Sequence, residues 1–203
     1  LQCNMSKIDT NIIFASPITS TILNDKKLNK SLITYINKER KKPGRVLSNE
    51  GGYQTKNVNL NHPTIKKFIK AIAPSVQQHI DFYKFKTART FKVLDLWFNI
   101  NGKNHFNYDH SHMGGGCDLS AAYYITVHPN SGDIHFKNPD IGAHSNGMSD
   151  LPVKEFNPFN QAYYFYTPKE TQLLVFSSAL EHRVKPNLNK RERITLSFNI
   201  RVI

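Results

Sequence analysis

The sequence predicts an α+β fold in which two helices precede a jelly-roll core of about eight short strands. Apolar residues recur at helical spacing in two stretches before residue 90. From Phe91 onward, short alternating apolar and polar stretches are separated by Gly, Asn and Pro turn signals. The 203 residues fit one domain over 1–203. We expect 1–90 to form a helical scaffold portion and 91–203 to form the jelly-roll core.

Two amphipathic stretches account for the helices. Asn24 or Asp25 suits the cap of a first helix that runs to about Glu39. A second apolar stripe covers Pro63–Ile80, with its proline in the tolerant first turn. Pro74 is expected to kink this helix. Both helices are expected to pack on a sheet as scaffold, without chemistry of their own.

The remaining elements are strands and turns. Strands are expected at Ile12–Phe14, Phe91–Ile100, Phe106–His112, Leu119–Val127, Asp133–Phe136, Ala162–Tyr166, Thr171–Ser177 and Arg193–Val202. Asn101-Gly102 is typical of a tight hairpin, so the strand from Phe106 should return beside the strand from Phe91. Ser48–Val58 contains two glycines and is expected to be a loop. Asn138–Phe159 is expected to be a long loop that acts as a lid.

Charge and cysteine content narrow the class of protein. The formal net charge is +12, from 27 basic and 15 acidic residues. This favours an acidic partner such as nucleic acid, an acidic protein or an anionic co-substrate. The basic residues are dispersed, so charge alone specifies no nucleic-acid site. Because no apolar run approaches the roughly 20 residues of a bilayer span, and no secretory signal pattern is visible, we expect no membrane association. The only cysteines are Cys3 and Cys117, which indicates reduced thiols in a cytoplasmic compartment.

His110 and His112 begin the strongest candidate site. In an extended strand, residues two apart share a face, so the two imidazoles would project side by side. His182 follows the apolar run Leu173–Ser178, and sheet pairing would bring it opposite them. Three nitrogen donors suit a first-row transition metal with open coordination positions. The sequence therefore predicts a metal site made of these three histidines.

The last expected strand carries a second candidate site. Arg193, Thr195, Ser197 and Asn199 alternate with apolar residues. On an outer surface this polar face would be an ordinary solvated edge. Facing the interior of a sandwich, Arg193 and Thr195 would instead form a buried anion site, because a guanidinium binds a carboxylate with two hydrogen bonds and a hydroxyl adds a third. Beside the metal, such an anchor would bind a small chelating acid.

The order of these motifs resembles the Fe(II)- and 2-oxoglutarate-dependent dioxygenases, especially their prolyl-hydroxylase-like branch with its small bacterial and phage members. The segments that carry the resemblance are Trp97–Asn99, His110–His112, Ser120–Tyr124, Phe136–Pro139 and Glu192–Asn199. They span more than half of the chain. The resemblance implies a double-stranded β-helix, which is a jelly roll, and an oxidoreductase that hydroxylates its substrate.

By this resemblance His110 is the first iron ligand and His182 the last. His112 stands where most relatives have an aspartate or glutamate, and a neutral imidazole also suits Zn, Ni or Cu. We expect His112 to be a ligand in a three-histidine site. The alternative is that it lies behind the ligands and that another group or water completes the metal. Asp109 should point to the opposite strand face, while Asp118 is a reserve ligand from the Gly-rich loop.

The resemblance also implies the contacts of the co-substrate. Arg193 would bind the distal carboxylate of 2-oxoglutarate, with Thr195 as its hydroxyl helper. Tyr124 matches a tyrosine that contacts this carboxylate in the relatives, and a core aromatic is the alternative. Asn99 would touch the co-substrate or the surroundings of the metal, and a structural amide is the alternative. The implied reaction consumes O2 and 2-oxoglutarate, releases succinate and CO2, and oxidises a C–H bond.

Two other functions remain open at this point. Three histidines with a bound water suit a zinc hydrolase, with Asp95, Asp109 or Asp118 as its general base, although Arg193 then has no role. A non-catalytic basic jelly-roll binding module is the second alternative. For the oxygenase, the expected substrate is a peptide or protein side chain, an acidic one included, or a small molecule. Nucleic acid has no specific support, and the expected location is the cytoplasm, that of the host if a phage encodes the chain.

Overall fold

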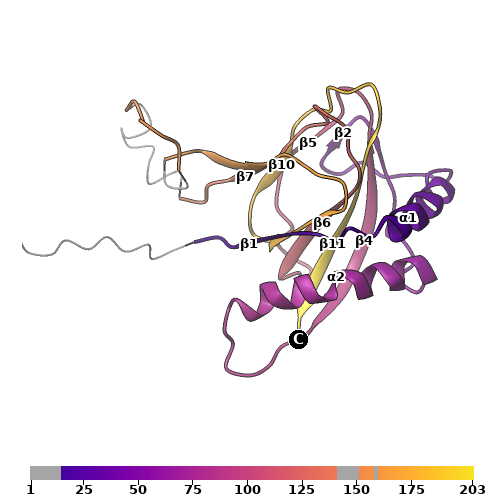
Figure 1. Ribbon diagram of the computed structural model, residues 1–203, viewed down its shortest axis with the longest axis horizontal. Helices are drawn as coiled ribbons and strands as arrows, with labels where there is room; N and C mark the ends of the chain where they lie inside the picture. The colour runs from indigo at the N-terminus through magenta and orange to yellow at the C-terminus, as the bar shows by residue number, and fades with distance from the viewer. Residues whose placement is uncertain (1–14, 141–150, 158–159) are drawn as a thin grey trace, which may run out of the picture.

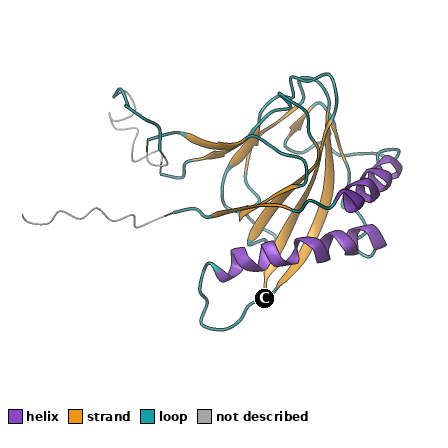
Figure 2. Cartoon of the chain, viewed as in Figure 1, coloured by secondary structure: helices purple, strands orange, loops and turns teal. Residues whose placement is uncertain are grey.

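The computed structural model describes residues 15–140, 151–157 and 160–203, which form two helices and two antiparallel sheets (Figures 1 and 2). The helices are α1 (Lys26–Glu39) and α2 (Pro63–Asp81). The strands are β1 (Ile18–Ile22), β2 (Asn49–Glu50), β3 (Tyr53–Gln54), β4 (Phe91–Asn101), β5 (Phe106–His110), β6 (Leu119–Thr126), β7 (Ile134–Lys137), β8 (Tyr163–Tyr166), β9 (Gln172–Ser177), β10 (His182–Val184) and β11 (Arg193–Val202).

The two sheets form the expected jelly-roll core. The larger sheet has the strand order β1-β9-β6-β11-β4-β3, and the smaller has β2-β5-β10-β7-β8. Strands that follow one another in the chain repeatedly lie in different sheets, as in β4 to β5 and β10 to β11. This alternation is typical of a jelly roll. The predicted α+β class with N-terminal helices is confirmed.

Both helices form where the sequence places them. The carboxylate of Asp25 accepts the backbone N–H of Leu28 at 2.9 Å, so it is the N-cap of α1. Helix α2 begins at Pro63 and continues through Pro74 to Asp81 as one element. The proline costs one backbone hydrogen bond, and the buried stripe on either side of it keeps the helix on the sheet.

The helices cover the outer face of the larger sheet (Figure 1). In α2, Ile65, Phe68, Ile72 and Val76 are completely buried. The ring of Phe68 packs on Tyr123 of β6 and on Phe198 of β11, with ring centroids 5.1 and 5.6 Å away. The main core therefore lies between the helices and this sheet, and the opposite face of the sheet is left for the site.

The hairpin predicted at Asn101-Gly102 is wrong. Strand β5 pairs with β2 and β10 in the smaller sheet, and β4 pairs with β3 and β11 in the larger one. The turn is instead tied to a distant loop, because the N–H of Asn104 donates to the carbonyl of Asn187 at 2.7 Å. A turn signal marks where the chain reverses, and the packing of the apolar faces decides which strand it joins.

Residues before β4 supply strands as well as helices. Strands β2 and β3 lie in the segment expected to be a loop, and β1 pairs with β9. The three-residue strand β10 is also additional to the expected set. The strand expected at Ile12–Phe14 lies outside the described residues, as does much of the lid expected at Asn138–Phe159. Neither α1 nor α2 has the length and apolar character required to cross a lipid bilayer.

Candidate metal centre and co-substrate cleft

A cavity of about 560 Å³ lies against the inner face of the larger sheet. Strands β4, β11 and β6 each turn polar side chains toward it, in rows set by their register. Asn99, Thr195 and Tyr124 face one another directly across the three strands. The polar face of the last strand therefore faces the interior, and its apolar residues enter the main core beneath the helices.

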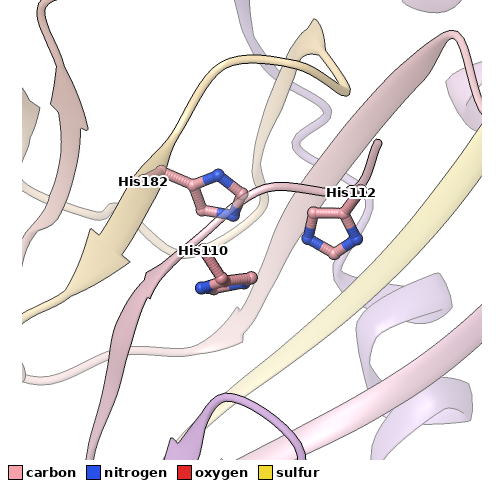
Figure 3. A group of neighbouring side chains, drawn as sticks. All are labelled: His110, His112 and His182. Atoms are coloured by element: carbon pink, nitrogen blue, oxygen red, sulfur yellow. The ribbon is translucent and has the colours of Figure 1, made fainter. Parts of the chain in front are cut away.

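The three histidines gather at this cavity from the facing sheet and the loop that follows it (Figure 3). His110 ends β5 and pairs directly with His182, the first residue of β10. The imidazoles of His110 and His182 have centroids 4.4 Å apart, and that of His112 lies 5.1 and 5.3 Å from them. One nitrogen from each of the three lies within 4.8 Å of the others.

Backbone carbonyls fix the orientation of two of these rings. Nδ1 of His110 lies 2.7 Å from the carbonyl oxygen of Tyr108, and Nδ1 of His182 lies 3.0 Å from that of Leu180. Each Nδ1–H therefore donates to a carbonyl, which leaves each Nε2 unprotonated. Burial lowers the pKa of His182 to about 3, with His110 adding to the effect, and burial also lowers the pKa of His110. Both rings are therefore neutral at pH 7, as metal binding requires.

His112 is held by stacking. Its ring lies nearly parallel to that of Trp97 at 5.6 Å between centroids. Its backbone N–H donates to the carbonyl of Ser178 at 2.8 Å, which fixes the chain just beyond β5. Burial and the neighbouring His110 lower the pKa of His112 to about 4. Stacking leaves both ring nitrogens free of protein partners among the described residues.

The carboxylates considered from the sequence do not join this group. Asp109 accepts a hydrogen bond from the hydroxyl of Tyr163 at 3.2 Å and lies 3.5 Å from a guanidinium nitrogen of Arg183. Asp118 accepts the backbone N–H of Val202 at 2.8 Å. Within the described parts of the chain, the metal-binding group consists of histidines alone.

Arg193 is fully buried at the opposite end of the cavity. Its Nη1 donates to the carbonyls of Ser131, Gly132 and Lys185. Its Nε is buried, and no described residue accepts a hydrogen bond from it. Burial lowers the pKa of Arg193 to about 10, so it remains charged at pH 7. A buried guanidinium with an unused donor is a site that an anion would complete.

Two neighbours complete this anionic end of the cavity. Tyr124 is buried, and burial raises the pKa of its phenol while Arg193 opposes the shift. Thr195 lies beside Tyr124 in register. The side-chain amide of Asn99 donates to Ser197 at 3.1 Å, and its buried oxygen has no partner within the described ranges. The four residues predicted for the co-substrate therefore line one cavity together with the histidines.

Sequence reasoning missed four residues that contribute to the site. Ser131 and Gly132 supply carbonyls to Arg193, although the sequence marks them only as a turn. Trp97 supports His112, and only its place on the inner face of β4 pointed to this role. The hydroxyl of Ser48 lies 3.4 Å from Nε2 of His110, and nothing in the local sequence indicates that contact.

The residues present fit an Fe(II) and 2-oxoglutarate site. Metal–nitrogen bonds are about 2.1 Å long, so two nitrogens on one ion lie at most about 4.2 Å apart. The three imidazole nitrogens, which lie within 4.8 Å of one another, are close to this limit. Arg193 lines the same cavity and supplies a cation for a dicarboxylate.

Comparison with known proteins supports the same conclusion. A family model described as "Putative 2OG-Fe(II) oxygenase" matches residues 95–199, about half of the chain. No curated protein matches the chain. Similar solved structures include a Pseudomonas putida prolyl-4-hydroxylase, at 15% identity and TM-score 0.62 over 91% of each chain. A viral collagen prolyl hydroxylase from Paramecium Bursaria Chlorella virus-1, in complex with 2-oxoglutarate, matches at 14% identity and TM-score 0.56, over 90% of this chain and 94% of its own.

A third similar structure is HygX from Streptomyces hygroscopicus with nickel, 2-oxoglutarate and hygromycin B bound. It matches at 9% identity and TM-score 0.61, over 91% of this chain and 82% of its own. At these identities the likeness shows a shared fold. The sequence family shows more, and favours the oxygenase over the hydrolase and the binding module. The chain belongs to the 2-oxoglutarate- and Fe(II)-dependent oxygenases, a family of oxidoreductases that needs Fe(II), 2-oxoglutarate and O2.

Proposed function

We propose that this oxygenase hydroxylates a C–H bond of a peptide, protein or small-molecule substrate. In this proposal His110, His112 and His182 hold Fe(II), and Arg193 binds the distal carboxylate of 2-oxoglutarate. The observation that carries the proposal is the common cavity of these groups. Three neutral imidazoles and the buried guanidinium of Arg193 line this one cavity.

In this proposal the neutral histidines hold the metal, and the positively charged Arg193 binds the co-substrate. Fe(II), when bound, supplies the centre at which 2-oxoglutarate and O2 react to oxidise the substrate. Three histidines contribute no negative charge, so the dianionic co-substrate has to offset the charge of the ion. Arg193 neutralises the far end of that dianion, and the hydroxyls of Thr195 and Tyr124 are placed to add hydrogen bonds.

The apolar wall beside the histidines excludes water. Phe176 and Phe136 pack on the ring of His182, with centroids 4.9 and 5.9 Å away. Together with Leu174 and Ile134 they form a second buried cluster between the sheets. A dry wall strengthens the electrostatic contacts and keeps the oxidising chemistry from solvent.

The proposed substrate classes are those found with similar solved structures. A prolyl hydroxylase from Trichoplax adhaerens was solved in complex with a peptide fragment, and HygX was solved with hygromycin B. The cavity here is large enough for a side chain or a small molecule beside the co-substrate.

We further propose that residues 1–203 act as one domain, in the cytoplasm.

Anaerobic titration with Fe(II) and 2-oxoglutarate tests the proposal. We expect a weak visible charge-transfer band in the wild-type protein, because both carboxylate and keto oxygens bind the ion. His182→Ala should abolish the band. Arg193→Ala should keep it but require roughly tenfold to a hundredfold more 2-oxoglutarate, since a buried charge-assisted contact is lost.

Matched variants control for general damage. His135 lies on β7 and packs against Tyr163 and Phe165. Arg191 precedes β11 outside the cavity. His135→Ala and Arg191→Ala should both leave the titration unchanged. If the wild type binds Fe(II) but 2-oxoglutarate produces no band, the proposed co-substrate site is wrong.

A further inference from the structure

The cavity continues past the histidines to a second polar end. Moving along the inner face of the larger sheet, the row of Asn99 and Thr195 is followed by a row of Asp95, Asn199 and Ser120. Trp97 lies between the two rows on β4. The 2-oxoglutarate end and this second end are therefore separated by the ring that supports His112.

Asp95 is oriented but only half satisfied. Ser120 donates its hydroxyl proton to the side-chain oxygen of Asn199 at 2.9 Å, which turns the amide N–H of Asn199 toward the Asp95 carboxylate. The Oδ1 of Asp95 is buried and has no hydrogen-bond partner among the residues that the structure describes. Burial raises the pKa of Asp95, while Asn199 and Arg45 favour its charged form. A buried carboxylate oxygen without a donor has a large desolvation cost, which a ligand can offset.

Arg45 is the opposite charge at the same end. Its backbone N–H donates to the carbonyl of Gln54 at 2.9 Å, and its guanidinium carbon lies 5.4 Å from the centroid of Trp97. Its Nε is buried and has no partner in the described part of the chain. Arg45 and Asp95 attract each other, yet among the described ion pairs none joins them. Each side chain therefore keeps unused hydrogen-bonding capacity, and both residues line the shared cavity.

We propose that this second end binds the ammonium and carboxylate groups of a free α-amino acid, which makes a small zwitterion the substrate class. The inference rests on the proposed oxygenase function of the adjacent histidine site. A simple cation would be repelled by Arg45 and by the metal, and a simple anion would be repelled by Asp95. A zwitterion satisfies both charges at once, with its ammonium on Asp95 and its carboxylate on Arg45.

The position of the pair suits this role. The ring of Trp97 contacts the guanidinium of Arg45 and also stacks on His112. An amino acid held by its main-chain groups between Arg45 and Asp95 would lie next to the histidine triad. Its side chain would then be the part available for oxidation, and the charged groups would fix its orientation.

Ligand titration tests the proposal on the full chain. The common L-amino acids are titrated calorimetrically into the protein, with and without Fe(II) and 2-oxoglutarate under nitrogen. The best binder is then compared with its N-acetyl derivative and with its carboxamide. We expect each derivative to bind roughly tenfold to a hundredfold more weakly, because each loses one charge-assisted contact.

Crossed variants assign each charge to its partner. Asp95→Asn should weaken the amino acid and its carboxamide but not the N-acetyl derivative. Arg45→Gln should weaken the amino acid and the N-acetyl derivative but not the carboxamide. Asp95→Glu and Arg45→Lys should recover part of the affinity, and circular dichroism checks the fold of every variant. Asp109→Asn is the matched control, because that carboxylate lines the same cavity but is already bonded to Tyr163 and faces Arg183.

The outcomes separate the two proposals. If no amino acid binds, or if the derivatives bind as well as the parent, the zwitterion site is wrong. A peptide-like amide site would give the second of these results. The charge-transfer band is recorded in the same samples, so its presence shows that the oxygenase proposal survives such a failure. Amino-acid binding without the band would support this site and overturn the Fe(II) and 2-oxoglutarate assignment.

Discussion

The guanidinium of Arg193 is held in place by backbone rather than by an acidic partner. Carbonyls of Ser131, Gly132 and Lys185 accept from a single nitrogen. This arrangement satisfies part of the cation without neutralising its charge, so the charge remains available for an incoming carboxylate. An ion pair in the same place would compete with the co-substrate.

Only a glycine at position 132 leaves room for these carbonyls to surround the guanidinium of Arg193. Its φ is +90°, and a Cβ there would lie 2.1 Å from the carbonyl oxygen of Lys185 and 2.7 Å from Nη1 of Arg193. We predict that Gly132→Ala destabilises the fold by about 1–3 kcal/mol through backbone strain and contact. It should also weaken 2-oxoglutarate binding roughly tenfold, because Arg193 is displaced.

Urea unfolding and the 2-oxoglutarate titration measure the two effects. Gly114→Ala is the control, since Gly114 has φ +109° but a Cβ there would meet nothing within 4 Å. It shares the backbone strain without the collision. Equal 2-oxoglutarate affinity in the two variants would contradict the role of Gly132 in seating Arg193.

His79 supplies a pH dependence that does not involve the metal site. It is buried in α2, with Nδ1 bonded to the hydroxyl of Thr19 at 2.9 Å and Nε2 unpartnered. Burial lowers the pKa of His79 below its ordinary 6.5. At a pH between the lowered pKa of the folded state and the ordinary pKa of about 6.5, the unfolded chain binds a proton that the folded chain does not. The free energy of unfolding therefore falls as the pH drops below about 6.5.

The expected result is that His79→Phe lessens this acid-dependent loss. Urea unfolding of the wild type and the variant is compared at about pH 7.5 and about pH 5.5. The free energy lost by the wild type on acidification should exceed that lost by the variant. Identical losses would mean that His79 does not contribute to the pH dependence.

At the scale of elements, period-two patterns were predicted reliably and pairing was not. The alternation in β4 and β11 correctly separated the cavity face from the core face, because a half-buried strand must alternate. The partner of β5 could not be predicted, because the turn after β4 is held by Asn187, far away in sequence. Strand β10 has only three residues, too few for a periodic pattern.

Helix α2 contributes its stability through one face. Phe68 has no exposed surface and packs on two aromatic rings of the larger sheet. We predict that Phe68→Ala lowers the free energy of unfolding by about 3–5 kcal/mol, from lost burial and the cavity that remains. Lys67→Ala changes the exposed neighbour and should have an effect within about 0.5 kcal/mol. Similar losses in both variants, measured by urea unfolding, would contradict this packing.

At the scale of the whole molecule, the N-terminal part closes the sheets. The edges of the larger sheet are β1 and β3, and one edge of the smaller sheet is β2. All three strands precede residue 90, where the sequence indicated mainly helical scaffold. Short strands within an otherwise helical segment carry little local signal, so they could not be predicted from the sequence.

A fragment of residues 91–203 should therefore not fold alone. It would lack both helices over the main core and would expose the backbone of β9, β4 and β5 at open sheet edges. We expect it to be insoluble or to show no cooperative thermal transition by circular dichroism, whereas the full chain shows one. A soluble fragment with a sharp transition would mean that the part from 91 onward is an independent unit.

Asn187 joins several segments at one end of the two sheets by hydrogen bonds. These bonds should determine how easily that end opens locally. It exchanges backbone hydrogen bonds with Asn104 and His105, and its side-chain amide donates to the carbonyls of Asn101 and Arg191 at 2.8 and 2.9 Å. The crossings from β4 to β5 and from β10 to β11 are thereby joined at a fully buried residue. In native-state hydrogen exchange, the amides of Asn104 and Asn187 should open only with global unfolding, while the irregular pairing of β10 with β5 exchanges through smaller fluctuations. The carbonyls that hold Arg193 would thus lie at the end of the molecule where amides exchange slowly. The histidines would lie where the strand pairing opens first.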